Sequence, residues 1–200
     1  MNNKVKIRTA RESDVEAILE IYSPFILKTA VSFEIKVPTK KDMWERISGI
    51  LKDLPFLVCE SEGKITGYAY ASNHRQREAY RWSKEVSAYV HPDFRGKHIA
   101  SGLYTSLIEI LKKQGITNLL AGIALPNPGS IALHKKFGFR KIAEYTAVGF
   151  KLGKWHNVGW WELNLDPGFS EPKEIIPFSE IKKTDVLKDA FLKGEETIIL

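Results

Sequence analysis

The sequence predicts one α/β domain, a mixed β-sheet with helices on both of its faces. Short segments of alternating or continuous apolar residues predict strands, and apolar stripes at helical spacing predict helices between them. Their order along the chain is β-α-α-β-β-β-α-β-α-β-β, an arrangement typical of layered α/β domains. The chain has 200 residues, of which 44% are hydrophobic and 27% charged, as in ordinary globular proteins.

The first half of the chain predicts four strands and two helices. Val5–Thr9 alternates and predicts the first strand. Ser13 and Glu16 have the spacing of a capping box and predict the start of a helix with an apolar face. The remaining elements of this half are expected at 39–51 for a helix, and at 56–61, 65–72 and 80–90 for strands.

The second half begins with a helix whose apolar stripe runs from Ile99 to Leu111 and which Gly115 closes. A short buried strand is expected at 119–123, then a short helix capped by Ser130, then two strands near 142–151 and 158–165. We therefore place the domain at residues 1–166. Residues 167–200 form a polar extension with one short amphipathic helix near 184–193, which we expect to dock on the domain or its partner and to be dispensable for chemistry.

Composition narrows the classes of function. The formal net charge is +6, a value that could suit a nucleic-acid-binding module. The sequence, however, has no dense block of lysine and arginine with interleaved aromatics, which such a module would be expected to have. A diffuse basic excess also suits a protein that binds a polyanionic cofactor. No apolar run approaches a membrane span and the N-terminus lacks a signal-peptide core, so a cytoplasmic location is expected. The single cysteine, Cys59, lies in a strand pattern and predicts neither a disulfide nor a metal site.

The most informative segment runs from Val90 to Gly102, where a strand ends and a helix begins within a few residues. Backbone amides at a helix N-terminus are unpaired and partly positive, so this bend could cradle a diphosphate. Arg95, Lys97 and His98 would add donors. Small residues and a cation also open many helices for structural reasons alone, and the loop by itself does not decide between these interpretations.

The loop resembles the pyrophosphate-binding loop of the GNAT superfamily of acyl-CoA N-acyltransferases, Arg/Gln-x-x-Gly-x-Gly/Ala, and Arg95 and Ala100 match its ends. Further segments narrow the resemblance, over residues 5–165, to the phosphinothricin acetyltransferase family. These are Tyr80–Glu85, Leu103-Tyr104-Thr105, Leu125-Pro126-Asn127 with Ser130, and Gly149–Lys151 with Trp155–Gly159. His98 departs from the pattern, since the family usually has glycine there, a residue suited to positive φ.

The resemblance implies two catalytic positions. Glu85 falls on the family's general base, although an arbitrary strand glutamate is more often solvated or salt-bridged. Alternation along the strand sends Glu85 and Tyr89 to one face and Val86 and Val90 to the other. His134 lies four residues after Ser130, on the same helix face, where the family has a histidine near the substrate. Its role as general acid or as substrate contact stays open.

The resemblance also implies a set of binding residues. Acetyl-CoA would lie on the backbone of Ala88, Tyr89 and Val90 and on the loop Arg95, Gly96, Lys97, His98, Ile99, Ala100 and Ser101, with Asn127 and Ser130 alongside. The substrate would meet Phe33, Arg75, Arg77, Tyr80 and His134. Arg75 and Arg77 could point the same way in an extended segment and grip one anion together, whereas a plain solvated turn is the alternative.

The resemblance thus implies an acetyl-CoA-dependent N-acetyltransferase of small amino-acid analogues such as phosphinothricin, methionine sulfone and methionine sulfoximine. A homodimer is expected, and no metal, nucleic-acid or membrane partner. The lone Cys59 offers no plausible nucleophile, which favours direct attack of the amine in a ternary complex. Alternatives are another amine substrate (a polyamine, an aminoglycoside or a protein N-terminus) and a non-catalytic acyl-CoA sensor. The two arginines argue against cationic substrates, and the presence of Glu85 argues against a sensor.

Overall fold

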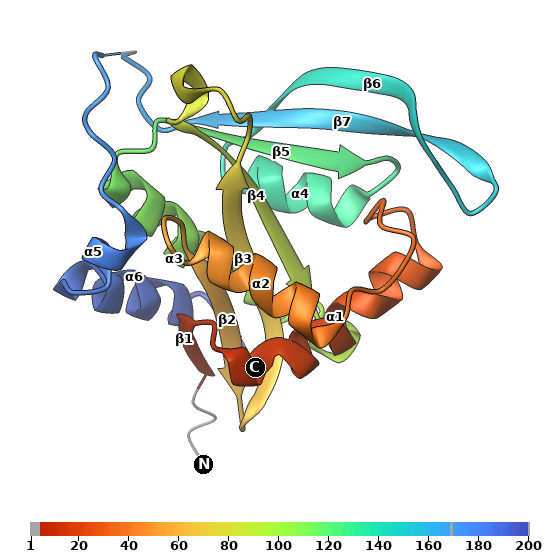
Figure 1. Cartoon of the computed structure of the whole chain (residues 1–200), viewed down its shortest axis with the longest axis horizontal. Coiled ribbons are helices and arrows are strands. Elements are labelled where there is room, and N and C mark those ends of the chain that lie inside the picture. The colour runs from red at the N-terminus through yellow and green to blue at the C-terminus, as the bar shows by residue number, and fades with distance from the viewer. Residues whose placement is uncertain (1–4, 169, 200) are drawn as a thin grey trace.

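The computed structural model describes residues 5–168 and 170–199, and it has a seven-stranded sheet in the order β1-β2-β3-β4-β5-β7-β6 (Figure 1). All neighbouring strands are antiparallel except β4 and β5, which are parallel. The strands are β1 Val5–Thr9, β2 Phe56–Ser61, β3 Lys64–Asn73, β4 Ser83–Val90, β5 Asn118–Ala124, β6 Arg140–Lys151 and β7 Lys154–Asn164. The mixed sheet and the predicted order of elements are confirmed.

Helices cover both faces of the sheet. They are α1 Val15–Lys28, α2 Lys40–Ile50, α3 Ile99–Gln114, α4 Pro128–Lys136, α5 Phe178–Ile181 and α6 Asp185–Glu195. The core is accordingly divided in two: α1 and α2 pack on one face, and α3 and α6 on the other. Within the described part of the chain, no helix combines the length and the hydropathy that a bilayer crossing requires.

The side-chain alternation expected for β4 is confirmed by these two cores. Val86 is buried in the core beneath α3. Tyr89 faces the opposite side, where its ring packs edge-on against Tyr22 and Phe25 of α1. A one-residue shift of β4 would exchange these faces, so the apolar pattern fixes its register.

Three local predictions are wrong in detail. The capping box of Ser13 and Glu16 does not form: a 3-10 turn, Glu12–Asp14, precedes α1, and the Asp14 carboxylate accepts from the Arg11 amide at 2.8 Å. The strand expected from residue 80 begins only at Ser83, because Glu78–Tyr80 is a 3-10 turn. The N-cap of α4 is Asn127, whose side chain accepts from the Ser130 amide, so Ser130 receives the cap instead of providing it.

The C-terminal extension is ordered against the domain. The helix expected near 184–193 is α6, and one further turn of helix, α5, was not predicted. Phe178 of α5 is fully buried. The buried Gln114 of α3 donates to the carbonyl of Ile176 at 2.8 Å, and the Trp82 indole donates to the carbonyl of Lys173 at 2.8 Å. The extension therefore shares the core on the α3 face.

Candidate active site

The two parallel strands at the centre of the sheet separate partway along their length. β4 and β5 pair only from Ser83 opposite Asn118 to Glu85 opposite Leu120, while β4 stays paired with β3 as far as Val90. Beyond Glu85, the edge of β4 that faces β5 has no partner strand. A cavity of about 920 Å³ fills the gap, lined by 86–90 of β4 and 121–124 of β5. Free backbone groups along this edge could pair with an extended ligand.

We call this cavity the cleft. The loop from β4 to α3 closes one end of it. The helical hydrogen bonds of α3 begin with the Gly102 amide and the His98 carbonyl, 2.9 Å apart. The amides of the first turn, 99–101, thus have no helical acceptor and are suited to an anion. Gly96 has φ +79° and His98 has φ +59°, so histidine adopts the left-handed conformation for which the family uses glycine.

All of the predicted acetyl-CoA residues line the cleft except Lys97. Its ammonium lies 4.9 Å from the centre of the Phe94 ring, and its carbonyl accepts from the Ile199 amide at 3.1 Å. Arg95 does line the cleft, with its guanidinium 5.9 Å from the Phe25 ring. The cleft therefore combines cations, free amides and an open strand edge, a combination that fits the diphosphate and amide groups of an acyl-CoA.

Several residues that line the cleft were missed by the sequence analysis. Lys136 of α4 donates to the Ser101 hydroxyl at 3.3 Å and so adds a cation next to the first turn of α3. Phe25 and Val31, from the end of α1 and the loop after it, line the same space. The Lys135-Lys136 pair looked like an ordinary solvated helix end, and no local pattern distinguished it.

Glu85 lies at the point where the strands separate, one residue before the lining of the cleft begins. Its side chain is 34% exposed, and one carboxylate oxygen lies 2.8 Å from His74 Nδ1. The His74 ring packs edge-on against Tyr80 and Trp160. The carboxylate is therefore held in place and still open to solvent, as a base that works directly or through a water needs to be. His74 was also missed, because only the register of β3 and β4 brings it to Glu85.

His134 is buried, and both of its ring nitrogens have hydrogen-bond partners. Its Nδ1 lies 2.7 Å from the Ser130 carbonyl, which can only accept, so Nδ1 carries the proton. Nε2 lies 3.1 Å from the Tyr104 hydroxyl and accepts from it when the imidazole is neutral. Burial lowers the pKa of His134, and burial raises that of Tyr104. Both residues line the cleft, and burial there disfavours the imidazolium form of His134.

The predicted substrate residues lie outside the lining of the cleft, apart from His134. Arg75, Arg77 and Tyr80 are exposed on the loop after β3, and neither arginine pairs with a carboxylate of the described residues. The chain bends at His74 and at 76–77, so this segment is not the extended one on which the two-arginine grip was predicted. Phe33 is 39% exposed and packs over Gly149 of β6, which leaves no room for a side chain there.

A covalent route through the cysteine is disfavoured by its surroundings. Cys59 is fully buried in β2, and burial raises the pKa of its thiol to about 11, so it is protonated at neutral pH. Nor does the described part of the chain hold a cluster of three or more His, Cys, Asp or Glu side chains placed to bind a metal ion.

Comparison with known proteins identifies the fold and the chemistry. The model of the acetyltransferase (GNAT) domain matches residues 7–160. A phosphinothricin N-acetyltransferase of Streptomyces viridochromogenes is 32% identical, over 88% of this chain and 96% of its own. The chain belongs to the GNAT superfamily, in its phosphinothricin acetyltransferase family. It is an acetyl-CoA-dependent N-acetyltransferase.

Two further relatives agree with this assignment. An L-methionine sulfoximine/L-methionine sulfone acetyltransferase of Salmonella typhimurium is 36% identical over 80% of this chain and 94% of its own. The crystal structure of a GNAT phosphinothricin acetyltransferase from Sinorhizobium meliloti, in complex with acetyl-CoA, superposes with a TM-score of 0.82 at 34% identity, covering 88% of this chain and 97% of the other. The separated strands β4 and β5 are thus the centre of a GNAT fold.

Proposed function

We propose that this GNAT enzyme acetylates the amino group of a small anionic amino-acid analogue, of the phosphinothricin, methionine sulfone or methionine sulfoximine type. The single observation that carries the proposal is the placement of Glu85 at the point where β4 leaves β5, with the acyl-CoA cleft directly beyond it. The named activities of the relatives support the choice of amine. The exposed Arg75 and Arg77, on the same loop as Tyr80, supply cations for the substrate's acidic groups.

Acetyl-CoA supplies the thioester and occupies the cleft. The pantetheine arm pairs with the open edge of β4 at 88–90, and the diphosphate lies on the amides of 96–101, with Arg95 and Lys136 beside it. Asn127 and Ser130 flank the arm from the start of α4. The N-terminus of α3 and the two cations act on the same diphosphate. The loop therefore contributes most of the free energy with which the diphosphate binds.

The reaction is direct attack of the amine nitrogen on the thioester carbon, with loss of the CoA thiolate. Glu85 takes the proton that the ammonium gives up, directly or through a water, and His74 holds the carboxylate in position. Because burial disfavours the charged form of His134 and both of its nitrogens are hydrogen-bonded, we assign it the task of orienting the Tyr104 hydroxyl at the cleft rather than that of an acid. As the tetrahedral intermediate collapses, the nitrogen loses its second proton to solvent, and the CoA thiolate takes its proton from solvent.

The test is thiol release from acetyl-CoA with methionine sulfone, phosphinothricin and methionine sulfoximine, measured against the twenty amino acids and against spermidine. Saturable turnover with an anionic analogue supports the proposal. Preference for spermidine would replace it with the polyamine alternative, and acetyl-CoA binding without turnover of any amine would favour a sensor.

We also propose that the enzyme is a cytoplasmic homodimer that associates through the hairpin of β6 and β7. The hairpin reaches past the end of β5 (Figure 1). It exposes several large apolar side chains, and β6 is an edge strand with a free backbone. They are Ile142, Tyr145, Val148, Phe150, Leu152 and Trp155, each at least 44% exposed. A buried, reduced cysteine and the use of acetyl-CoA suit the cytoplasm.

Light scattering after gel filtration tests the association. The wild-type protein is expected at the mass of two chains, and the double variant Phe150→Glu/Trp155→Glu at the mass of one, because two charges would be placed in an apolar contact. A matched variant on another exposed apolar residue, Leu192→Glu on α6, should remain dimeric. A wild-type monomer at high protein concentration would contradict the proposal.

A further inference from the structure

The loop that follows β4 is held in an unfavourable backbone conformation. His98 has φ +59° and ψ +17°, the left-handed region, directly before the first residue of α3. For a residue with a Cβ this conformation costs roughly 1–2 kcal/mol. Such a conformation persists only where the surrounding structure enforces it. The question is therefore which contacts hold this loop.

The end of the C-terminal extension makes one such contact. The Ile199 amide donates to the carbonyl of Lys97, the residue before His98, at 3.1 Å. The neighbouring Ile198 packs on the first turn of α3 so closely that a Cβ on Gly102 would lie 2.6 Å from its Cγ1 atom. Since Lys97 does not line the cleft, the extension grips the loop without entering the space proposed for acetyl-CoA.

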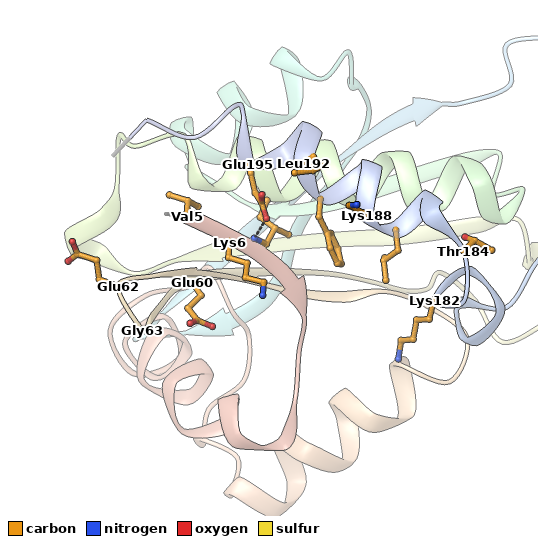
Figure 2. Close-up of a pocket in the computed structure, with 13 residues that line it drawn as sticks. Val5, Lys6, Glu60, Glu62, Gly63, Lys182, Thr184, Lys188, Leu192 and Glu195 are labelled. Carbon is orange, nitrogen blue, oxygen red and sulfur yellow. Dashed lines mark hydrogen bonds between the residues drawn. The ribbon is translucent and has the colours of Figure 1, made fainter. Parts of the chain in front are cut away.

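Helix α6 fixes the position of these last residues. α6 crosses α3 where two glycines meet: a Cβ on Gly194 would lie 2.5 Å from the Gly102 carbonyl oxygen. The Ser106 hydroxyl donates to the carbonyl of Ala190 at 2.9 Å. On the other side of α6, the Glu195 carboxylate accepts from the Ile7 amide of β1 at 2.8 Å, as Figure 2 shows. The helix is thus tied both to α3 and to the sheet edge.

The space beside α6 does not itself provide a site. A groove of about 880 Å³ separates α6 from β1, with Val5, Leu187 and Phe191 among its apolar walls (Figure 2). The charged residues around it are three lysines, Lys6, Lys182 and Lys188, and three glutamates, Glu60, Glu62 and Glu195. The equal numbers of positive and negative side chains do not indicate a ligand of either charge. The groove also shares no lining residue with the cleft. What α6 contributes lies at its C-terminal end.

We infer that the C-terminal extension is part of the acetyl-CoA site: residues 185–199 brace the diphosphate loop from behind, and Ile198 and Ile199 keep it in its left-handed conformation. The inference rests on the proposed placement of the diphosphate on this loop. It replaces the expectation that the extension is dispensable for chemistry. The brace lies outside residues 7–160, the part of the chain that matches the model of the GNAT domain.

The sharpest test is aimed at the hydrogen bond between Ile199 and Lys97. Ile199→Pro removes the backbone N–H that donates to the Lys97 carbonyl, whereas the matched variant Ile199→Ala keeps this N–H. Loss of one such bond should raise the Kd for CoA, measured by calorimetry, and the KM for acetyl-CoA about fivefold. The kcat, the KM for the amine and the melting temperature should stay close to wild type. Ile199→Ala should behave as wild type throughout.

A second variant and a second measurement make the test independent of that one proline. Deletion of residues 198–200 removes the Ile198 packing as well, and it should weaken CoA binding further while the domain remains folded. Hydrogen exchange should then be faster at the amides of 96–101 and unchanged in β2 and β3, because only the braced loop is released.

The outcomes separate the two proposals. If Gly96→Pro weakens CoA binding but Ile199→Pro and the deletion do not, the brace is wrong and the loop assignment stands. If Gly96→Pro leaves CoA binding unchanged, the loop assignment itself is wrong. Equal losses for CoA and the amine, together with a lower melting temperature, would show a general structural role of the extension and would overturn the brace.

Discussion

At the scale of single residues, the chemistry depends on a carboxylate in a held position. Glu85 owes its place to β4, its orientation to His74 and its access to solvent to the separation of β4 from β5. A strand glutamate with no such neighbours would be an ordinary surface residue. The contacts of this one side chain therefore carry the proposed mechanism.

Glu85→Gln should keep acetyl-CoA binding and lower kcat by roughly 10²-fold or more, the usual scale of lost general-base catalysis. The deficit should shrink at high pH, where the amine loses its proton without help. Steady-state rates from pH 6 to 10 measure both effects. The matched variant Glu78→Gln, at a side chain that is 88% exposed, should be indistinguishable from wild type. A wild-type profile for Glu85→Gln would remove this residue from the mechanism.

Arg77→Lys and Arg77→Ala should both lose about 10- to 150-fold in kcat/KM toward anionic analogues, mainly through KM. Lysine keeps the charge but lacks the planar pair of donors, and a bidentate contact contributes about 1.5–3 kcal/mol. A simple uncharged amine, assayed in parallel, should show almost no change. Equal losses for charged and uncharged amines would mean that Arg77 shapes the loop instead of binding an anion.

At the scale of elements, the decisive unit is the junction of β4, its loop and α3. The strand supplies a free edge, the loop supplies cations, and the helix supplies amides that point out of its first turn. Each feature is common by itself. Their meeting at one end of the cleft supports the proposed diphosphate site, and we infer that the C-terminal extension braces the same loop from outside.

Gly96→Pro should raise the acetyl-CoA KM at least tenfold, because Gly96 has φ +79° and proline is fixed near −65°. Gly63, in the turn between β2 and β3, has φ +75° and equally open surroundings, so Gly63→Pro suffers the same backbone conflict away from the cleft. Gly63→Pro should lose stability without a change in acetyl-CoA KM. Similar KM values for the two folded variants would contradict the loop assignment.

At the scale of the whole molecule, one buried ion cluster ties the N-terminal elements together. Arg8 of β1 bonds the Asp14 carboxylate at 2.7 and 2.8 Å and reaches Glu60 of β2. Burial alone would raise the pKa of Asp14, but the Arg8 guanidinium and the Arg11 amide outweigh it and hold the pKa below its ordinary value. The cluster thus adds a pH-dependent term to the free energy of unfolding.

Asp14→Asn should destabilise the protein by roughly 3 kcal/mol at pH 7, the lower end for breaking a buried pair, which lowers the Tm by about 6–12 °C. Because the folded pKa of Asp14 is depressed, its contribution is complete above the unfolded pKa of about 4 and is lost as the pH falls through the folded value. The Tm difference between variant and wild type should therefore narrow in acid. The exposed pair of Lys40 and Glu16 gives the control: Glu16→Gln should shift the Tm by less than about 2 °C.

The sequence by itself determined the order of the elements, the two faces of β4 and the loop before α3. These features depend on local alternation, on helical spacing and on the glycine and proline residues that end helices and strands. It also gave the resemblance that named Glu85 and the cleft residues. It misplaced the caps of α1 and α4, because the Asp14 carboxylate accepts from the Arg11 amide and the Asn127 side chain accepts from the Ser130 amide, earlier in the chain than the caps it predicted.

Only the tertiary structure decided which distant residues meet. The strand register brought His74 to Glu85, the packing of α4 brought Lys136 to Ser101 and His134 to Tyr104, and the crossing of α6 over α3 brought Ile199 to Lys97. Each contact joins segments at least eleven residues apart, and no local pattern encodes them. They follow from the burial of apolar faces against one another, which fixes the positions of the loops and of α6 only when the whole domain has packed.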